Sequence, residues 1–195
     1  RLENNQLTGF IPAELGNLTS LNILWLFGNS LTGSIPAQLG NLASLTDLRL
    51  ENNQLTGFIP AELGNLASLI SLNLSNNYLT GALPSEIGQL EKLENLYLSN
   101  TLLMESIPQE FLNLYRLKEF EIEDNFMCGS ALDEFGNSLP IDVKFSSSGN
   151  SGWCWPAPYS GVTPVDPSLG VNNVGVYYLP EETIYSCVNT SINSS

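Results

Sequence analysis

Apolar residues recur with a fixed spacing of 24 residues from the start of the chain to about residue 127. A proline marks each copy, and an aliphatic residue stands directly before each of these prolines. A further apolar residue follows three positions after the proline, and a leucine follows six positions after it. The prolines are Pro12, Pro36, Pro60, Pro84 and Pro108. Self-similarity at one period over so many columns indicates a repeat architecture.

Each copy predicts the same three parts in the same order. A segment such as Leu72–Asn77 alternates apolar and polar residues, which is typical of a short, half-buried strand. A turn with a glycine follows, at Gly81 in that copy. A proline then opens a short helical turn, with a glycine just past its end, as in Pro60–Gly64. One coil alone cannot bury its leucines, so we expect stacked coils with a continuous core and a parallel sheet along one side.

An asparagine closes the strand segment in most copies. A buried amide must satisfy its hydrogen bonds, and the backbone groups of stacked neighbouring coils are suited to do so. We therefore interpret this column as structural. Its members are Asn5, Asn29, Asn53, Asn77 and Asn125.

The same alternation predicts which strand residues point away from the core. Side chains two positions apart in a strand share a face, so three rows form one surface. The central row reads Arg1, Trp25, Arg49, Asn73, Tyr97 and Glu121. The flanking rows read Glu3, Phe27, Glu51, Ser75, Ser99 and Glu123, and Ile23, Asp47, Ser71, Asn95 and Glu119.

Two large apolar side chains, Trp25 and Phe27, stand in rows that should face solvent. An exposed aromatic residue beside an arginine is typical of an interface anchor, and Trp25 beside Arg49 is suited to a cation–π contact. The alternative to partner binding is that upstream coils or a glycan cover these rings. The predicted partner-binding residues are Trp25, Phe27, Arg49, Glu51, Tyr97, Glu119, Glu121 and Glu123.

The chain is strongly acidic, with 20 Asp and Glu residues against 6 Lys and Arg residues. This balance disfavours nucleic acid as a partner, because phosphate backbones are bound by basic surfaces. Glu119, Glu121 and Glu123 share one face of a predicted strand, and Asp124 follows. We interpret them as an acidic end of the surface, for a basic partner or for solvent. Glu121, Glu123 and Asp124 are also a weak candidate for calcium, and no other metal site is predicted.

Catalysis is not predicted. The chain has no histidine, which excludes Ser-His-Asp and Cys-His mechanisms, and it has neither a glycine-rich phosphate loop after a strand nor a CxxC motif. Glu119 and Glu121 are about 7 Å apart in an extended strand, near the separation used by glycosidases. Open carboxylates nevertheless lack the burial that raises the pKa of a general acid. We expect a non-enzymatic protein without a cofactor.

Three cysteines and four N-glycosylation sequons favour a secreted or cell-surface protein. The cysteines are Cys128, Cys154 and Cys187, and the odd number leaves one unpaired, bonded to a segment missing from the sequence, or bonded to another chain. Loop entropy barely separates a Cys128–Cys154 bond from a Cys154–Cys187 bond. The sequons are at Asn17, Asn73, Asn189 and Asn193. We expect no membrane span, since no apolar run approaches the required length, and a start that lies inside a repeat.

The period stops after Asn125, which divides the chain into three predicted parts. Residues 1–127 form the repeats. Residues 128–152 form a capping segment, with a short helix over 131–135, a strand over 141–145 and a linker from Ser146. Residues 153–195 form a small cysteine-containing extension that matches no pattern.

The pattern LxxLxLxxNxLTGxIPxxLGNL, seen in Leu45–Leu66, resembles the plant-type leucine-rich repeat over about residues 2–127. The resemblance implies an α/β solenoid. Its coils would form a right-handed superhelix with a concave parallel sheet, a second short sheet around each LTG, and short helices or 3-10 turns on the convex side. It also implies an irregular, disulfide-containing C-terminal cap. Because the Cys-Gly ending of such arrays pairs within the cap, it implies a Cys128–Cys154 bond, with Cys187 unpaired or intermolecular.

The chain departs from this family pattern in two places. Thr101 replaces an asparagine, and Met104 and Glu105 replace the Thr-Gly of the turn, so we expect a locally irregular path there. No paired-cysteine cap of the kind that normally precedes such repeats is seen before Leu2, and on that reading we expect the first strand to leave an open sheet edge.

The resemblance implies extracellular recognition of a protein, peptide or glycan on the concave face. The alternative is a structural subunit of an extracellular wall, matrix or filament that self-assembles through the open edge. Family analogy alone suggests an inhibitor of a cell-wall-degrading enzyme. A regular threonine column suits ice binding, but this threonine belongs to the ordinary LTG turn. The column consists of Thr8, Thr32, Thr56 and Thr80.

Overall fold

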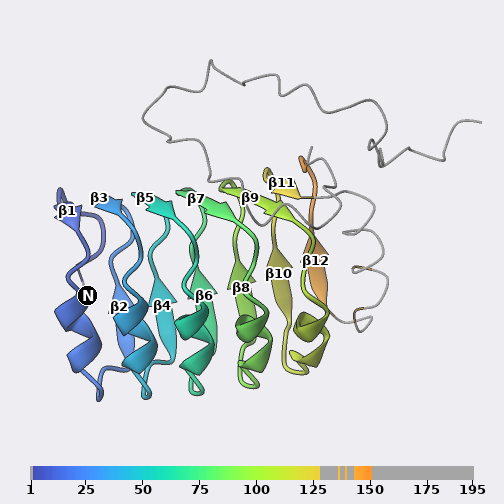
Figure 1. Ribbon diagram of the computed structural model, residues 1–195, viewed down its shortest axis with the longest axis horizontal. Coiled ribbons are helices and arrows are strands. Elements are labelled where there is room, and N and C mark those ends of the chain that lie inside the picture. Colours follow the sequence, from blue (N-terminus) through green and yellow to red (C-terminus); the bar gives the residue numbers. More distant parts are fainter. Residues whose placement is uncertain (1, 128–135, 137–138, 140–142, 151–195) are drawn as a thin grey trace, which may run out of the picture.

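The computed structural model describes residues 2–127, 136, 139 and 143–150. Figure 1 shows the coils stacked side by side in chain order, with two rows of strands and a row of short helices running along the stack. Four coils, from β2 to η5, each contribute one strand to each row and one 3-10 helix. Among the described residues, no helix is long and apolar enough to cross a membrane.

One six-stranded sheet corresponds to the predicted concave sheet and is called the concave sheet below. Its neighbours pair in parallel in the order β12-β10-β8-β6-β4-β2. Trp25 pairs with Arg49, Arg49 with Asn73, Asn73 with Tyr97, and Tyr97 with Glu121, so the predicted central row is confirmed from Trp25 to Glu121, while Arg1 lies outside the described residues. The strands are β2 (Ile23–Trp25), β4 (Asp47–Arg49), β6 (Ser71–Asn73), β8 (Asn95–Tyr97), β10 (Glu119–Glu121) and β12 (Lys144–Ser146).

The second sheet lies around the predicted LTG turns and is also parallel. Gly57 and Gly81 end their strands with φ angles of 79° and 81°, a conformation that suits glycine. Its strands are β1 (Thr8–Phe10), β3 (Ser30–Gly33), β5 (Gln54–Gly57), β7 (Tyr78–Gly81), β9 (Leu102–Glu105) and β11 (Phe126–Met127).

The predicted irregular path at Met104 and Glu105 is wrong. Strand β9 pairs with both of its neighbours, and Glu105 takes a φ of 72° where the other coils have glycine. The ring of Phe58 packs so closely on Gly81 that an added Cβ would lie 2.5 Å from it. The equivalent neighbour of Glu105, 23 residues earlier, is the small Ala82. The backbone therefore keeps the common turn, and the missing ring leaves space for a side chain.

A 3-10 helix follows a proline in each of the first five coils. Pro60, for example, has a φ of −65° directly before its helix. Gly64 lies inside that helix rather than just past its end. A Cβ added at this position would lie 2.4 Å from the Glu86 carbonyl oxygen. Close helix packing, not turn geometry, therefore requires this glycine. The helices are η1 (Ala13–Asn17), η2 (Ala37–Asn41), η3 (Ala61–Asn65), η4 (Ser85–Gln89) and η5 (Gln109–Asn113).

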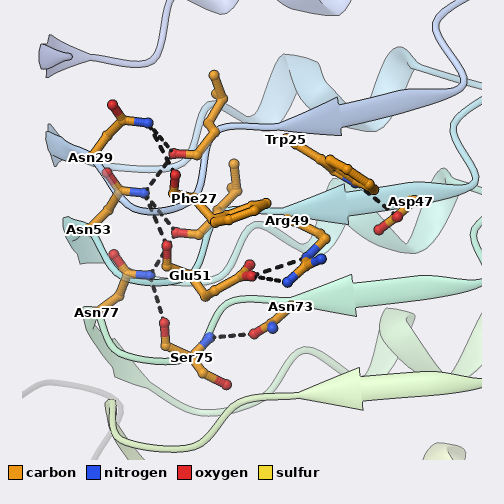
Figure 2. Close-up of polar contacts among 12 residues, drawn as sticks. Trp25, Phe27, Asn29, Asp47, Arg49, Glu51, Asn53, Asn73, Ser75 and Asn77 are labelled. Atoms are coloured by element: carbon orange, nitrogen blue, oxygen red, sulfur yellow. Dashed lines mark hydrogen bonds and ion pairs between the residues drawn. The ribbon is translucent and has the colours of Figure 1, made fainter. Parts of the chain in front are cut away.

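The core is a continuous column of aliphatic residues and phenylalanines along the stack, as predicted. Beside it, the asparagines of the column bond to backbone groups; Asn53, Asn77 and Asn125 are buried, Asn29 is half-buried and Asn5 is exposed. Asn53 donates from Nδ2 to the carbonyl oxygens of Leu26 and Leu50, each at 3.0 Å, and its Oδ1 accepts the Leu31 N–H at 3.0 Å. Asn29, Asn53 and Asn77 each tie their own coil to the preceding one in this way (Figure 2). The structural interpretation of this column is confirmed.

The solenoid continues beyond the predicted end of the repeats. Strand β12 pairs with β10, and Asn150 bonds as a ladder asparagine does: its Nδ2 donates to Ile122 O at 2.8 Å, and its Oδ1 accepts the Met127 N–H at 3.1 Å. Residues 146–150 are therefore part of a coil and not the predicted linker. The interval from Asn125 to Asn150 is 25 residues, and Ser147 stands where a leucine is expected, which hid this coil from the periodicity. The predicted helix over 131–135 and the extension over 153–195 lie outside the described residues.

Candidate functional site

Three side chains form a cluster at the β2–β4 end of the concave sheet. We call Trp25, Phe27 and Arg49 the aromatic–arginine cluster (Figure 2). The ring centroids of Trp25 and Phe27 lie 6.1 Å apart, and the planes are tilted by 54°. The Arg49 Cζ lies 4.4 Å from the Phe27 centroid and 5.4 Å from the Trp25 centroid. The predicted cation–π contact is confirmed, and it involves both rings.

Two carboxylates hold this cluster in place. The Trp25 indole N–H donates to Asp47 Oδ2 at 2.8 Å. Arg49 donates from Nε and Nη2 to the same oxygen, Glu51 Oε1, at 3.0 and 2.5 Å. Glu51 is only 5% exposed. The guanidinium is therefore fixed between a buried carboxylate and two aromatic rings before any partner arrives.

Both carboxylates keep one oxygen atom without a partner. Within the described part of the chain, Asp47 Oδ1 and Glu51 Oε2 are buried and accept no hydrogen bond. An unpaired buried acceptor costs about 1–3 kcal/mol, and more when it is charged. These two atoms are therefore unusual for a folded protein.

The centre of the concave sheet is hollowed, with a volume of about 610 Å³. Asp47, Arg49 and Glu51 line one end of the hollow, and Tyr97 and Glu121 line the other. The side chains between them are small and polar: Ser71, Asn73, Ser75, Asn95 and Ser99. The lining suits hydrogen-bonding groups rather than an apolar ligand.

The sequons at Asn73 and Asn17 lie in different environments. Asn73 sits in the hollow, half-buried, and its Oδ1 accepts the Ser75 N–H at 3.1 Å. The hydroxyl of Ser75, the third sequon residue, accepts the Ser99 N–H at 3.1 Å. Asn17 is exposed at the end of η1. Asn189 and Asn193 lie outside the described residues, as do Cys128, Cys154 and Cys187, so their predicted roles stay predictions.

At the β10–β12 end, a lysine joins the predicted acidic residues. Lys144 Nζ lies 3.6 Å from Glu119 Oε1 and 3.5 Å from Glu121 Oε1. Ser146 and Ser148 donate their hydroxyls to Glu123 Oε1. Because these groups are largely solvated, the ion pairs contribute little to stability.

Neighbouring donors shift the pKa values of this acidic end. The Tyr97 hydroxyl donates to Glu119 Oε2. This hydrogen bond is the main cause that lowers the pKa of the Glu119 carboxyl, and the charge of Lys144 is the second. The Ser146 and Ser148 hydroxyls lower the pKa of Glu123. Burial, and then the bond to Glu119, raises the pKa of Tyr97 to about 12. A general acid needs a raised carboxyl pKa, whereas the pKa values of Glu119 and Glu123 are both lowered.

The weak calcium candidate, Glu121, Glu123 and Asp124, is not supported. Glu121 contacts Lys144, Glu123 accepts two serine hydroxyls, and Asp124 is exposed. In the described part of the chain, no three acidic, histidine or cysteine side chains are grouped as metal ligands would be.

The structure thus divides the predicted partner-binding residues into two groups. Trp25, Phe27, Arg49 and Glu51 gather at one end, and Tyr97 joins the three glutamates at the other. Asp47 and Lys144 are additional members. Alternation along the strand already placed Asp47 on this face. Lys144 stood in the predicted strand over 141–145, but the 25-residue interval hid its pairing with Glu119 in β10.

Comparison with protein families gives one consistent result. A family model described as leucine rich repeat matches residues 43–103, and a second leucine-rich-repeat model matches residues 1–18 and 20–42. No curated protein matches the sequence.

Several solved structures are similar to this chain. The leucine-rich-repeat ectodomain of the membrane receptor kinase GASSHO1/SCHENGEN3 from Arabidopsis thaliana, in complex with CASPARIAN STRIP INTEGRITY FACTOR 2, is 31% identical with a TM-score of 0.66; the match covers 75% of this chain and 18% of that one. For the Arabidopsis thaliana BIR3–SERK2 complex, the identity is 36%, the TM-score is 0.60, and the coverage is 66% and 68%. A leucine-rich-repeat protein of Leptospira interrogans is 36% identical with a TM-score of 0.64, and the match covers 74% of this chain and 36% of that one. The chain therefore spans less than two thirds of the first and third of these proteins.

Proposed function

The chain belongs to the leucine-rich-repeat family, and we propose that it is a non-enzymatic, extracellular recognition module that binds a protein or peptide on its concave sheet. The observation that carries this proposal is the aromatic–arginine cluster. Tryptophan and arginine are enriched among the residues that dominate binding energy at interfaces. Because Arg49 is already fixed by Glu51 and two rings, little side-chain entropy is lost when a partner binds.

The similar proteins support a protein or peptide among the predicted partner classes. GASSHO1/SCHENGEN3 is described in complex with CASPARIAN STRIP INTEGRITY FACTOR 2, and BIR3 in complex with SERK2. The first of these is the ectodomain of a membrane receptor, which supports an extracellular or cell-surface location for this chain. Proteins with different functions can share one fold, so the function has to be inferred from the site itself.

The polar contacts of the concave sheet support binding rather than catalysis. The pKa values of Glu119 and Glu123 are lowered by hydroxyl donors, so both carboxyls are charged at neutral pH. Charged, partly exposed groups provide complementarity to a partner and govern its rate of association.

The proposal is tested with peptides selected from a random displayed library on the immobilised chain. Trp25→Ala and Phe27→Ala each remove one ring of the cluster. We expect the affinity of the selected peptides to fall by about tenfold or more, which is the loss typical of a central anchor. Calorimetry or surface plasmon resonance measures the dissociation constants.

Tyr115→Ala is the matched control, since Tyr115 is 80% exposed and follows η5, away from the concave sheet. Equal losses for Tyr115→Ala and Trp25→Ala would overturn the proposal. So would a native protein that forms filaments, because that result favours the alternative of a structural subunit.

A further inference from the structure

We propose that the hollow of the concave sheet receives a basic side chain of the partner, which binds the buried carboxylate of Glu51, and a second N–H donor, which binds Asp47. This inference rests on the proposed function and names the chemistry of the partner. It starts from the acceptors that the fold leaves unpaired within the described residues, Glu51 Oε2 and Asp47 Oδ1.

The contacts of Arg49 and Trp25 explain why one oxygen of each carboxylate is left unpaired. Arg49 directs two N–H groups to a single oxygen of Glu51, so the second oxygen is not used. Trp25 donates to one oxygen of Asp47 and leaves the other. A partner that brings N–H donors removes the cost of these unpaired acceptors on binding, whereas an apolar or acidic side chain leaves it in place.

The local charge also favours a cation. Asp47 and Glu51 contribute two negative charges and Arg49 one positive charge, which leaves one negative charge at this end of the hollow. One further cation balances it. The chain as a whole carries a net charge of −14, which attracts a basic partner and repels an acidic one.

Glu51 Oε2 is buried, so a basic group reaches it by displacing the more exposed side chain of Arg49 in part. The side chain of Arg49 is 35% exposed and that of Glu51 is 6% exposed, so Arg49 is the solvent-facing partner of the pair. A guanidinium or ammonium from the partner shares the Glu51 carboxylate with Arg49, which keeps its contact with the Phe27 ring. Carboxylates accept such shared, charge-assisted bonds through both oxygens.

The spacing of the two carboxylates requires two separate donors. Asp47 and Glu51 are four residues apart in an extended segment, so their Cα atoms are about 13 Å apart. One side chain does not span that distance. A basic side chain at Glu51 together with a backbone or side-chain N–H at Asp47 is within reach of an extended peptide segment, because alternate residues of a strand are about 7 Å apart.

The experiment uses the full chain and the peptides that bind it from the random library. The first readout is whether peptides that lose affinity for the Trp25→Ala protein share a lysine or arginine. The second is replacement of that arginine by citrulline, which keeps the shape and removes the charge. The third is the affinity of Glu51→Gln and Asp47→Asn proteins, with Glu14→Gln as a control that removes one exposed charge on η1.

We expect about a tenfold loss of affinity for citrulline and for Glu51→Gln, a smaller loss for Asp47→Asn, and none for Glu14→Gln. Asp47→Asn retains an oxygen for the Trp25 indole, so it remains informative if Glu51→Gln does not fold. Peptides that need Trp25 but share no basic residue, or that tolerate citrulline, would overturn this inference and leave the proposed function standing. Peptides that do not need Trp25 would instead overturn the proposed function.

Discussion

At the scale of single residues, Arg49 connects most of the contacts at the β2–β4 end of the concave sheet. Its position beside Trp25 was predictable, because Trp25 and Arg49 occupy the same row in consecutive copies of a repeat with a constant period. Its ion pair with Glu51 was not predictable, since Asp47 and Glu51 flank Arg49 equally in the sequence. The choice depends on side-chain rotamers: Trp25 binds Asp47, and Arg49 turns toward Glu51.

Glu105 is the residue whose backbone conformation conflicts most clearly with its type. Its φ of 72° is left-handed, a region that disfavours residues with a Cβ. We predict that Glu105→Gly raises the free energy of unfolding by about 1 kcal/mol, because relief of this conformation exceeds the entropy cost of glycine. Urea unfolding monitored by circular dichroism measures the change.

Glu105→Ala is the control for that prediction. It removes the carboxylate and keeps the Cβ, so it should leave stability within about 0.5 kcal/mol of the wild type. An equal gain for both variants would show that charge, not backbone conformation, is responsible.

At the scale of the coil, the asparagine ladder is the element that links neighbours, and Thr101 interrupts it. Thr101 donates its hydroxyl to Asn125 Oδ1, and the same hydroxyl oxygen lies 3.3 Å from Leu98 O. In the preceding coil, Asn77 accepts the Leu55 N–H at 3.0 Å and donates to Leu50 O and Leu74 O. By the same offsets, an asparagine at position 101 would accept the Leu79 N–H and donate to Leu74 O.

We therefore predict that Thr101→Asn raises the free energy of unfolding by about 1 kcal/mol, the typical net value of a buried hydrogen bond. The reverse change, Asn53→Thr, should lower it by about 1–3 kcal/mol, since it leaves buried backbone groups unpaired. Chemical denaturation of both variants tests this pair. A loss of stability in Thr101→Asn would mean that the fifth coil has adapted to threonine.

The coil that ends at Asn150 shows where sequence periodicity fails. Sheet pairing tolerates an extra residue outside the strand, because a loop can absorb it while the ladder contacts stay the same. Asn150 keeps those contacts, although its spacing and the leucine pattern before it have changed. A method that counts a fixed period therefore ends one coil too early.

At the scale of the whole molecule, stacking turns a one-dimensional pattern into a polarised surface. The β2–β4 end of the concave sheet carries two rings and an arginine, the middle is hollow and polar, and the β10–β12 end carries three glutamates and Lys144. The fold, the rows and the core followed from the sequence, because each coil repeats the same local rules. The hollow and its unpaired carboxylate oxygens did not, since they depend on the conformations of individual side chains.

Hydrogen–deuterium exchange with and without a selected peptide tests the central claim, that the concave sheet is the binding surface, most directly. We predict slower exchange over residues 47–53, 71–77 and 95–99, which include β4, β6, β8 and the loops that line the hollow. Exchange over the helices η1 to η4 should not change. Slower exchange confined to those helices, with none at the hollow, would contradict the account.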